Sequence, residues 1–114
     1  MRLVVCGGRD FGDWRMMEAV LSNFGGAVEL AHGGARGADV MSGDYARRRG
    51  WPVTVYEADW KAHGRGAGPR RNQRMLDDFH PDLVIAFPGG KGTADMVARC
   101  RRQGVEVTVV DPVG

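Results

Sequence analysis

The sequence predicts an α/β three-layer sandwich with a mainly parallel sheet of about five strands, in a single domain spanning residues 1–114. Short, continuously apolar segments alternate along the chain with segments whose apolar residues recur at helical spacing. Glycine accounts for 18 of the 114 residues, about twice the usual share, and clusters where the apolar segments end. Strands that are apolar throughout are typical of a parallel sheet covered by helices on both faces.

Each predicted strand is a short apolar or β-branched run. The first strand, residues 2–8, reads RLVVCGG and ends in glycines, as does the second, AVELAHGG at 27–34. The third, PVTVYEAD at 52–59, is rich in β-branched residues, which favour strands. DLVIAF at 82–87 and VEVTVVD at 105–111 complete the sheet.

Four helices are predicted between these strands. The first follows Asp13 over residues 14–24, and the second begins at Asp39 and ends before Gly50. Residues 70–79 and 93–103 also carry apolar residues at helical spacing, and Gly104 follows the last helix as a stop signal. Residues 60–69, rich in Gly and Pro, are predicted to form a loop.

Composition excludes several classes of function. The net charge of +2 is too small to indicate nucleic-acid binding by bulk electrostatics, although Lys61–Arg74 holds five Lys or Arg and no acid. Such a run is more commonly a solvated basic surface. Two separate cysteines, Cys6 and Cys100, form neither a disulfide framework nor a metal site, so we expect no metal and a cytoplasmic protein. No apolar run approaches the length of a membrane span, and the N-terminus does not resemble a signal peptide.

Three similar turns are predicted at one edge of the sheet. CGGRDFGD follows the first strand, HGGARGAD the second and FPGGKGTAD the fourth. The carboxyl ends of parallel strands form the ligand crevice of such sheets. Glycines followed by a helix N-terminus present unpaired N–H groups to an anion, usually a phosphate. Neither HGGARGAD nor FPGGKGTAD is a Walker motif, and neither is a GxGxxG motif with an acid about twenty positions on. A single such turn is commonly a plain connection, but three together favour ligand binding.

The four segments VVCGGRDF, AHGGARGAD, AGPRRNQRM and AFPGGKGT, taken in this order, resemble the YspA-like, YpsA-related branch of the SLOG superfamily. That superfamily also contains the LOG nucleotide phosphoribohydrolases and the DprA/Smf DNA-processing proteins. The resemblance implies a Rossmann-like fold and a nucleotide or nucleotide-derived ligand, such as an ADP-ribose-like molecule, at the glycine turns. It also implies a homo-oligomer. We expect no bound cofactor.

The candidate ligand-binding residues combine the three turns with the start of the third predicted helix. Arg9 follows Gly-Gly directly, Arg36 follows Gly-Gly after Ala35, and both are expected to meet an anion. Arg71 is expected to clamp a phosphate through two hydrogen bonds. The predicted set is Gly7, Gly8, Arg9, Gly33, Gly34, Ala35, Arg36, Gly37, Asp39, Arg71, Asn72, Pro88, Gly89, Gly90, Lys91, Gly92 and Thr93.

The resemblance to LOG enzymes breaks at two positions. Arg71 and Met75 match a LOG arginine and methionine, but the lysine that follows that arginine in LOG enzymes is Asn72 here. PGGxGT is present from Pro88 to Thr93, but the glutamate that follows in LOG enzymes is Met96 here. A thioether cannot stabilise the positive charge that develops on a sugar during N-glycosidic cleavage. Asp95 points about 100° away from position 96 on a helix and would need the helix start to be rotated. Asp10, Asp13 and Asp39 could supply a carboxylate, although Asp at such positions usually caps a helix or turn, and a cap is favoured for Asp39.

The remaining polar and aromatic candidates have ordinary structural interpretations beside functional ones. His32 lines the pocket or is a structural histidine, His63 has no visible partner, and Arg70 is assigned to solvent. One of Trp51 and Trp60 could stack on a base, although core or rim packing is the usual role of tryptophan.

Three functions follow from these observations. The first is binding of a nucleotide-like ligand for sensing or sequestration without turnover. The second is a nucleoside-phosphate N-glycosidase that resembles LOG, with a carboxylate supplied from another position. The third is single-stranded DNA binding through Lys61–Arg74, which we do not favour because the run lacks interleaved aromatic residues.

Overall fold

The computed structural model describes residues 1–111 of the chain. Its sheet contains five parallel strands: β1 (Arg2–Cys6), β2 (Glu29–His32), β3 (Val53–Val55), β4 (Leu83–Ala86) and β5 (Val107–Val109). The strand order is β3-β2-β1-β4-β5, and every neighbouring pair is parallel. The predicted α/β class and parallel sheet are confirmed, and residues 112–114 of the expected domain lie outside the described part.

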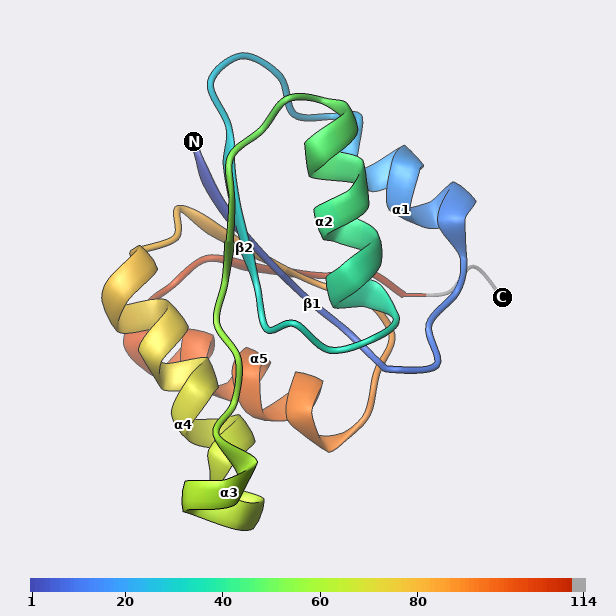
Figure 1. Ribbon diagram of the computed structural model, residues 1–114. Coiled ribbons are helices and arrows are strands. Elements are labelled where there is room, and N and C mark those ends of the chain that lie inside the picture. The colour runs from blue at the N-terminus through green and yellow to red at the C-terminus, as the bar shows by residue number, and fades with distance from the viewer. Residues whose placement is uncertain (112–114) are drawn as a thin grey trace.

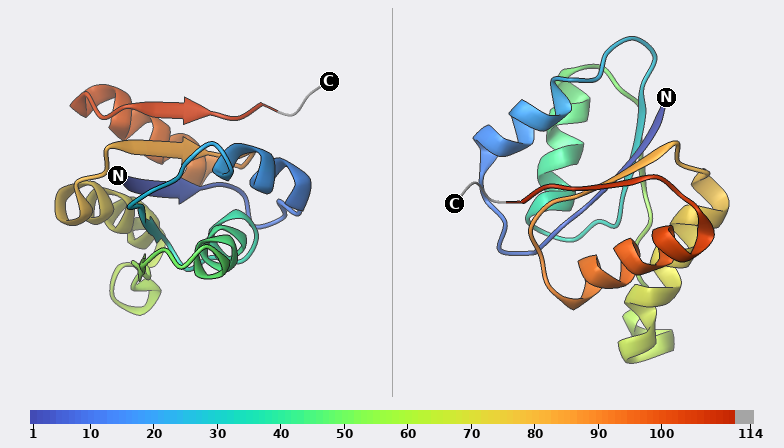
Figure 2. Two further views of the ribbon diagram at one scale, coloured as in Figure 1. Left: turned by 90° about the horizontal axis from the view of Figure 1, so that it is seen from above. Right: turned by 180° about the vertical axis from the view of Figure 1, so that it is seen from behind.

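Helices cover both faces of the sheet (Figures 1 and 2). Helices α1 (Trp14–Leu21) and α2 (Ala38–Arg48) lie on one face. The other face carries α4 (Ala67–Arg74), the π-helix η2 (Met75–Phe79) and α5 (Lys91–Gln103). The order in which strands are added to the sheet reverses between β1 and β4, which places a crevice at the carboxyl ends of these two strands.

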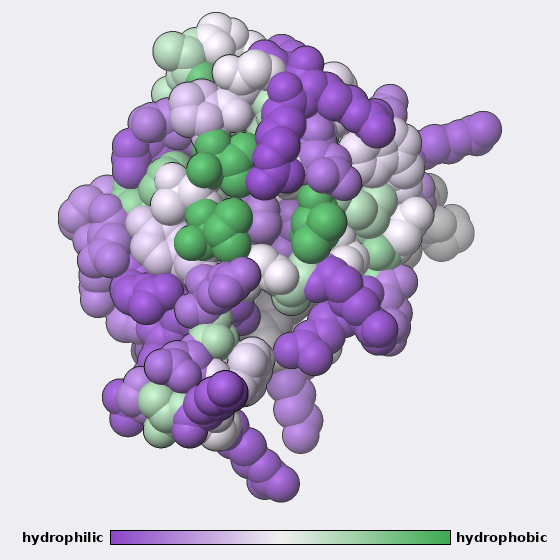
Figure 3. All heavy atoms as spheres, in the orientation of Figure 1, coloured by the Kyte–Doolittle hydropathy of each residue, from purple (hydrophilic) through white to green (hydrophobic). Residues whose placement is uncertain are grey.

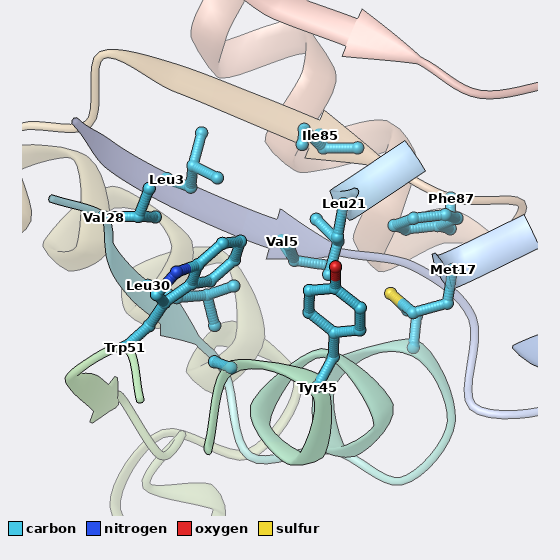
Figure 4. Packing of buried hydrophobic residues seen from close by; sticks show 12 residues of the cluster. Leu3, Val5, Met17, Leu21, Val28, Leu30, Tyr45, Trp51, Ile85 and Phe87 are labelled. Carbon is cyan, nitrogen blue, oxygen red and sulfur yellow. The ribbon is translucent and has the colours of Figure 1, made fainter. Parts of the chain in front are cut away.

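Two apolar clusters hold these layers together, because successive residues of a strand point to opposite faces. On β1, Leu3 and Val5 face α1 and α2, whereas Val4 and Cys6 face the other layer. Figure 4 shows the first cluster, in which Trp51 is buried beside Tyr45 and Leu30. The two aromatic rings meet edge to face, with centroids 5.5 Å apart. Trp51 is therefore a core residue and is not available to stack on a ligand.

The segment predicted as a loop at 60–69 is largely helical. It contains the short helix α3 (Trp60–His63), a 3-10 turn η1 (Gly64–Gly66) and the first residues of α4. The Asp59 side chain caps α3 by accepting a hydrogen bond from the Ala62 N–H at 3.1 Å. Pro69 is tolerated as the third residue of α4 because the first-turn N–H groups of a helix have no intrahelical partner. The expectation of a loop was wrong.

Most other helix boundaries agree with the sequence to within a few residues. The first helix ends at Leu21, earlier than expected, and α5 begins at Lys91, two residues earlier than expected. Asp13 is the N-cap of α1 and accepts a hydrogen bond from the Met16 N–H at 3.0 Å. None of the helices within residues 1–111 has both the length and the apolarity to cross a membrane.

Candidate functional site

A cavity of about 750 Å³ lies at the carboxyl end of the sheet. This volume is within the usual range for small-molecule sites. Its walls come from the three glycine turns, the segment after β3, and α4. The lining residues are Cys6, Gly7, Gly8, Arg9, Gly33, Gly34, Ala35, Asp39, Glu57, Ala58, Trp60, Arg65, Gly68, Pro69, Arg71, Asn72, Met75, Gly90, Lys91, Gly92, Thr93 and Asp95.

The three glycine turns meet at Gly8. Its N–H donates to the Pro88 carbonyl at 2.9 Å, and its own carbonyl accepts from the Ala38 N–H at 3.2 Å. A Cβ on Gly37 would collide with the Gly8 carbonyl, and a Cβ on Gly89 would lie 2.6 Å from the Gly8 nitrogen. These two glycines are therefore required for the turns to touch one another.

Four of the predicted ligand-binding residues lie outside the cavity wall. Gly37, Pro88 and Gly89 form the contacts between turns. Arg36 points to solvent, with a side chain 76% exposed, and pairs with Asp10 at 3.2 Å. Three of these residues support the turns, Arg36 belongs to the outer surface, and contact of the four with a ligand stays a prediction.

The second turn uses its amide groups internally. The N–H groups of Gly33 and Ala35 donate to the Asp39 carboxylate at 3.1 and 3.3 Å, and the Gly34 N–H donates to His32 Nδ1 at 2.9 Å. These amides are not available to a ligand. The second turn therefore shapes the cavity, and its Gly33, Gly34 and Ala35 amides bond to the protein itself and not, as expected, to an anion.

The third turn differs because it leads directly into the N-terminus of α5. The first intrahelical bond of α5 runs from the Ala94 N–H to the Gly90 carbonyl at 3.0 Å. The N–H groups of Lys91, Gly92 and Thr93 precede it and have no intrahelical acceptor. With the positive end of the helix dipole, they form the part of the cavity best suited to an anion.

Two cationic side chains line the same cavity. Arg9 and Lys91 both line the cavity wall and are exposed. No ion pair within residues 1–111 involves either side chain. Their charges are therefore available to an anionic ligand.

Arg71 and Asn72 connect the second turn with α5. Arg71 Nη1 donates to the Gly33 carbonyl at 2.7 Å, and its Nε donates to Asn72 Oδ1 at 3.1 Å. Asn72 Nδ2 in turn donates to the Gly92 carbonyl at 3.2 Å and to Asp95 Oδ2 at 3.0 Å. Two of its nitrogens are therefore engaged in positioning the walls of the cavity, and the phosphate clamp expected of Arg71 stays a prediction.

Asp39 is a buried carboxylate inside the first turn of α2. The helix N-cap is Gly37, so the predicted capping role of Asp39 is wrong. Asp39 instead closes the second turn through the two N–H groups described above, and its residue surface is 5% exposed. Burial raises the pKa of Asp39 to about 6, although the backbone hydrogen bond from Ala35 and the charge of Arg71 oppose the shift.

The sequence profile of the YspA, cpYpsA-related SLOG family, YAcAr, matches residues 1–63, which include the first two glycine turns. The chain is also 32% identical over 117 residues to the Gene 61 protein of Mycobacterium phage D29, and the similarity covers 93% of each chain. This chain belongs to the YAcAr family. The SLOG resemblance predicted from the sequence is thereby confirmed.

Carboxylates line the cavity of this YAcAr protein, although the residue at the position of the LOG glutamate is not an acid. Met96 is fully buried in the second apolar cluster, so position 96 faces the core of this chain. Asp95 lines the cavity without any rotation of α5, contrary to expectation. Although burial opposes it, hydrogen bonds from Arg99 and Asn72 hold the pKa of Asp95 below its usual value. Asp95 is therefore an anionic group beside the anion site.

Sequence reasoning missed much of the wall supplied by the segment after β3 and by α3. Trp60 is 49% exposed, lines the cavity, and carries the Arg9 guanidinium 5.8 Å from its ring centroid. Glu57 and Arg65 also line the wall. The Gly-Pro composition of 60–69 concealed this wall, because it favoured a loop. An acid at the end of the third strand was the available signal for Glu57.

The basic run Lys61–Arg74 does not form one continuous charged surface. Arg65 lines the cavity, Arg71 is half-buried, and Arg70 is exposed as expected. Arg74 lies 5.5 Å from the Tyr56 ring centroid and donates to the Glu57 carbonyl at 3.2 Å. Hydrophilic side chains predominate on the face drawn in Figure 3, and apolar ones form small separate patches.

His32 has a structural position below the second turn. It is 3% exposed, and its Nδ1 accepts the Gly34 N–H, which leaves Nε2 as the protonated nitrogen. Burial, followed by the charge of Arg47, lowers the pKa of His32 to about 4. His32 is therefore neutral at pH 7. Within residues 1–111, no three His, Cys, Asp or Glu side chains gather closely enough to hold a metal ion.

Proposed function

We propose that this protein binds a nucleotide or a nucleotide-derived small molecule, such as an ADP-ribose-like compound, for sensing or sequestration without turnover. The observation that carries the proposal is the convergence of α5 amides, Arg9 and Lys91 on one cavity. Free N–H groups and two cations are the groups that phosphate oxygens require. Membership of the SLOG family is consistent with such a ligand.

Trp60 supports a ligand that carries an aromatic base as well as a phosphate. Its indole is half exposed at the cavity wall, although a tryptophan gains stability from burial. Stacking of a nucleobase on this ring would cover the exposed apolar surface, and base–aromatic stacking contributes about 1–3 kcal/mol. A site for inorganic phosphate alone would leave this surface exposed.

The two arginines that follow Gly-Gly turns provide the test. Arg9→Ala removes a cavity cation, whereas Arg36→Ala removes a surface arginine outside the cavity. In thermal-shift and calorimetric titrations against AMP, ADP, ATP, NAD⁺ and ADP-ribose, we expect at least one probe to stabilise the native protein. Arg9→Ala is expected to lower the affinity for that probe by roughly tenfold or more, and Arg36→Ala to leave the affinity unchanged. Equal losses in both variants, or no stabilisation by any probe, would contradict the proposal.

A second candidate function is hydrolysis of a nucleoside-phosphate N-glycosidic bond. The anionic Asp95 at the cavity wall favours it, because a carboxylate can stabilise the positive charge that develops on the sugar. Chromatographic release of free base from nucleoside monophosphates, abolished in Asp95→Asn, would establish this activity. Intact nucleotides after prolonged incubation would support binding without turnover.

The proposal extends to the assembly state, for which we infer a homo-oligomer from the SLOG resemblance. Sedimentation equilibrium over a hundredfold range of protein concentration would test it. A monomer throughout that range would rule the assembly out.

A further inference from the structure

We infer that Glu57 recognises the ribose hydroxyls of the ligand, and that the cavity therefore selects ribonucleotides over 2′-deoxyribonucleotides. This inference rests on the proposed nucleotide ligand and specifies its sugar. It begins from the three carboxylates that line the cavity, Asp39, Glu57 and Asp95. Two of the three are already occupied by protein donors.

Hydrogen bonding within the protein separates Glu57 from the other two acids. Asp39 accepts two backbone N–H groups of the second turn, and Asp95 accepts from Asn72 and Arg99. No side-chain hydrogen bond or ion pair within residues 1–111 engages the Glu57 carboxylate. Only the Glu57 backbone carbonyl is used, by Arg74. Glu57 therefore retains its full acceptor capacity at the cavity wall.

The position of Glu57 relative to the second turn matches the place of a ribose. Glu57 follows β3, which pairs with β2 through His32 and Val55, so the acid lies beside the turn that follows β2. A Cβ built on Gly34 would lie 3.1 Å from Glu57 Cγ and 3.5 Å from Oε1. These short distances show that the Glu57 side chain lies directly beside the second turn.

The unit β2–turn–α2–β3 shares one feature, the position of an acid, with the unit by which α/β folds bind nucleosides, although the amides of its turn are engaged within the protein. In that arrangement a glycine turn follows one strand, and an acid about 20 residues later, at the end of the next strand, accepts hydrogen bonds from the ribose. Here Gly34 and Gly37 keep the spacing of the last two glycines of GxGxxG, and His32 replaces the first. Glu57 follows Gly37 by 20 residues. The full motif is therefore absent from the sequence, although the structure supplies the acid at its expected place.

The chemistry of a free carboxylate explains the selectivity. An ionised carboxylate accepts two hydrogen bonds, which matches the adjacent 2′- and 3′-hydroxyls of ribose. A 2′-deoxyribose supplies one donor fewer, and a 2′-phosphate brings a negative charge against the carboxylate. We therefore expect the site to accept an unmodified ribose and to disfavour both altered sugars.

The experiment compares matched sugars by isothermal titration, with ADP against 2′-deoxy-ADP, GDP against 2′-deoxy-GDP, and AMP against adenosine 2′,5′-bisphosphate. Wild type is expected to bind at least one ribonucleotide roughly tenfold or more tightly than its 2′-deoxy partner, because a hydrogen bond to a charged group is lost. Glu57→Ala is expected to bind the two members of that pair equally. Glu106→Ala is the control, since Glu106 is exposed and precedes β5 at the opposite end of the sheet.

The outcomes separate this inference from the proposed function. Equal affinity of wild type for ribo- and deoxyribonucleotides would overturn the role of Glu57 and leave nucleotide binding intact. A ribose preference that persists in Glu57→Ala would also overturn it. Failure of every nucleotide to bind wild type would reject the proposed function and this inference together. Because Glu57 is exposed, its replacement is expected to leave the thermal unfolding midpoint unchanged, which checks that the variant is folded.

Discussion

At the scale of single residues, glycines of the same motif have different physical roles. In FPGGKGT, a Cβ on Gly89 would collide with the first turn, whereas Cβ atoms on Gly90 and Gly92 would meet nothing within 4 Å. Gly89 is therefore required by the fold. Gly90 and Gly92 line the cavity, so the fold leaves space there that a ligand can use.

This difference predicts opposite effects on stability and binding for Gly92→Ala. Gly92 lies in the first turn of α5 with no neighbour near its Cβ position, so alanine is expected to raise the free energy of unfolding by up to about 1 kcal/mol. The added methyl group lies at the anion end of the cavity and is expected to weaken nucleotide binding. Urea unfolding and titration with the best probe of the panel measure the two effects.

Gly89→Ala serves as the comparison for Gly92→Ala. It is expected to lower the unfolding free energy, because its methyl group would press on the Gly8 amide and on Thr93 Oγ1. If Gly92→Ala bound nucleotide as wild type does, the anion site at the start of α5 would be excluded.

At the scale of secondary-structure elements, the sequence was most informative where apolar periodicity was long. The strands and α1, α2 and α5 follow from the pattern of apolar residues and from stop glycines such as Gly104, which has a φ of 72°. Residues 60–69 escaped prediction because three glycines and a proline dominate their composition. The π-helix η2 was also not predicted, because the spacing of its apolar residues suits an α-helix equally well.

The end of η2 gives an element-scale prediction. His80 follows it in the left-handed conformation, with φ 51° and ψ 62°, which glycine adopts at no steric cost. His80 also precedes Pro81, which restricts its backbone further. We expect His80→Gly to raise the free energy of unfolding by about 1 kcal/mol, as measured by urea denaturation at pH 7.

His63→Gly is the matched control for this change. His63 is exposed at the end of α3 and has a negative φ of −123°, so glycine there relieves no strain. It is expected to be neutral or destabilising. Equal stabilisation by both replacements would show that the left-handed conformation of His80 carries no cost.

At the scale of the whole molecule, the sequence predicted that three turns gather at one edge of the sheet, and the structure brings them into contact at Gly8. It could not predict how the amides of those turns are used. That depended on the side chains of Asp39 and His32 folding back onto their own turn. The wall that carries Glu57 and Trp60 was also beyond prediction, because it depends on the packing of α3 beside the turns.

Asp39 and His32 together predict an unusual dependence of stability on pH. The pKa of Asp39 is raised from 3.8 to about 6, so its native carboxylate costs stability above pH 6, and that cost disappears as the pH falls toward 4. The pKa of His32 is lowered from 6.5 to about 4, so burial of the neutral imidazole contributes its full stabilisation above pH 6.5. This stabilisation is lost as the pH falls from 6.5 through 4. Between pH 6 and 4 the two effects oppose each other.

Replacement of Asp39 by Asn removes the opposing effect of the carboxylate, so the pH dependence of stability due to His32 is no longer offset. From pH 7 to 4.5, we expect the unfolding free energy of Asp39→Asn to fall by about 2 kcal/mol more than that of wild type. Urea denaturation at several pH values measures this difference, in which the other carboxylates cancel. Parallel pH profiles for the two proteins would show that burial of Asp39 does not shift its titration.

The double use of Gly8 has a mechanical consequence. Its carbonyl accepts from both Phe11 and Ala38, at the entrances to α1 and α2, while its amide is tied to Pro88 in the loop that leads to α5. A displacement of this one residue would therefore shift the entrances of helices on both sides of the sheet.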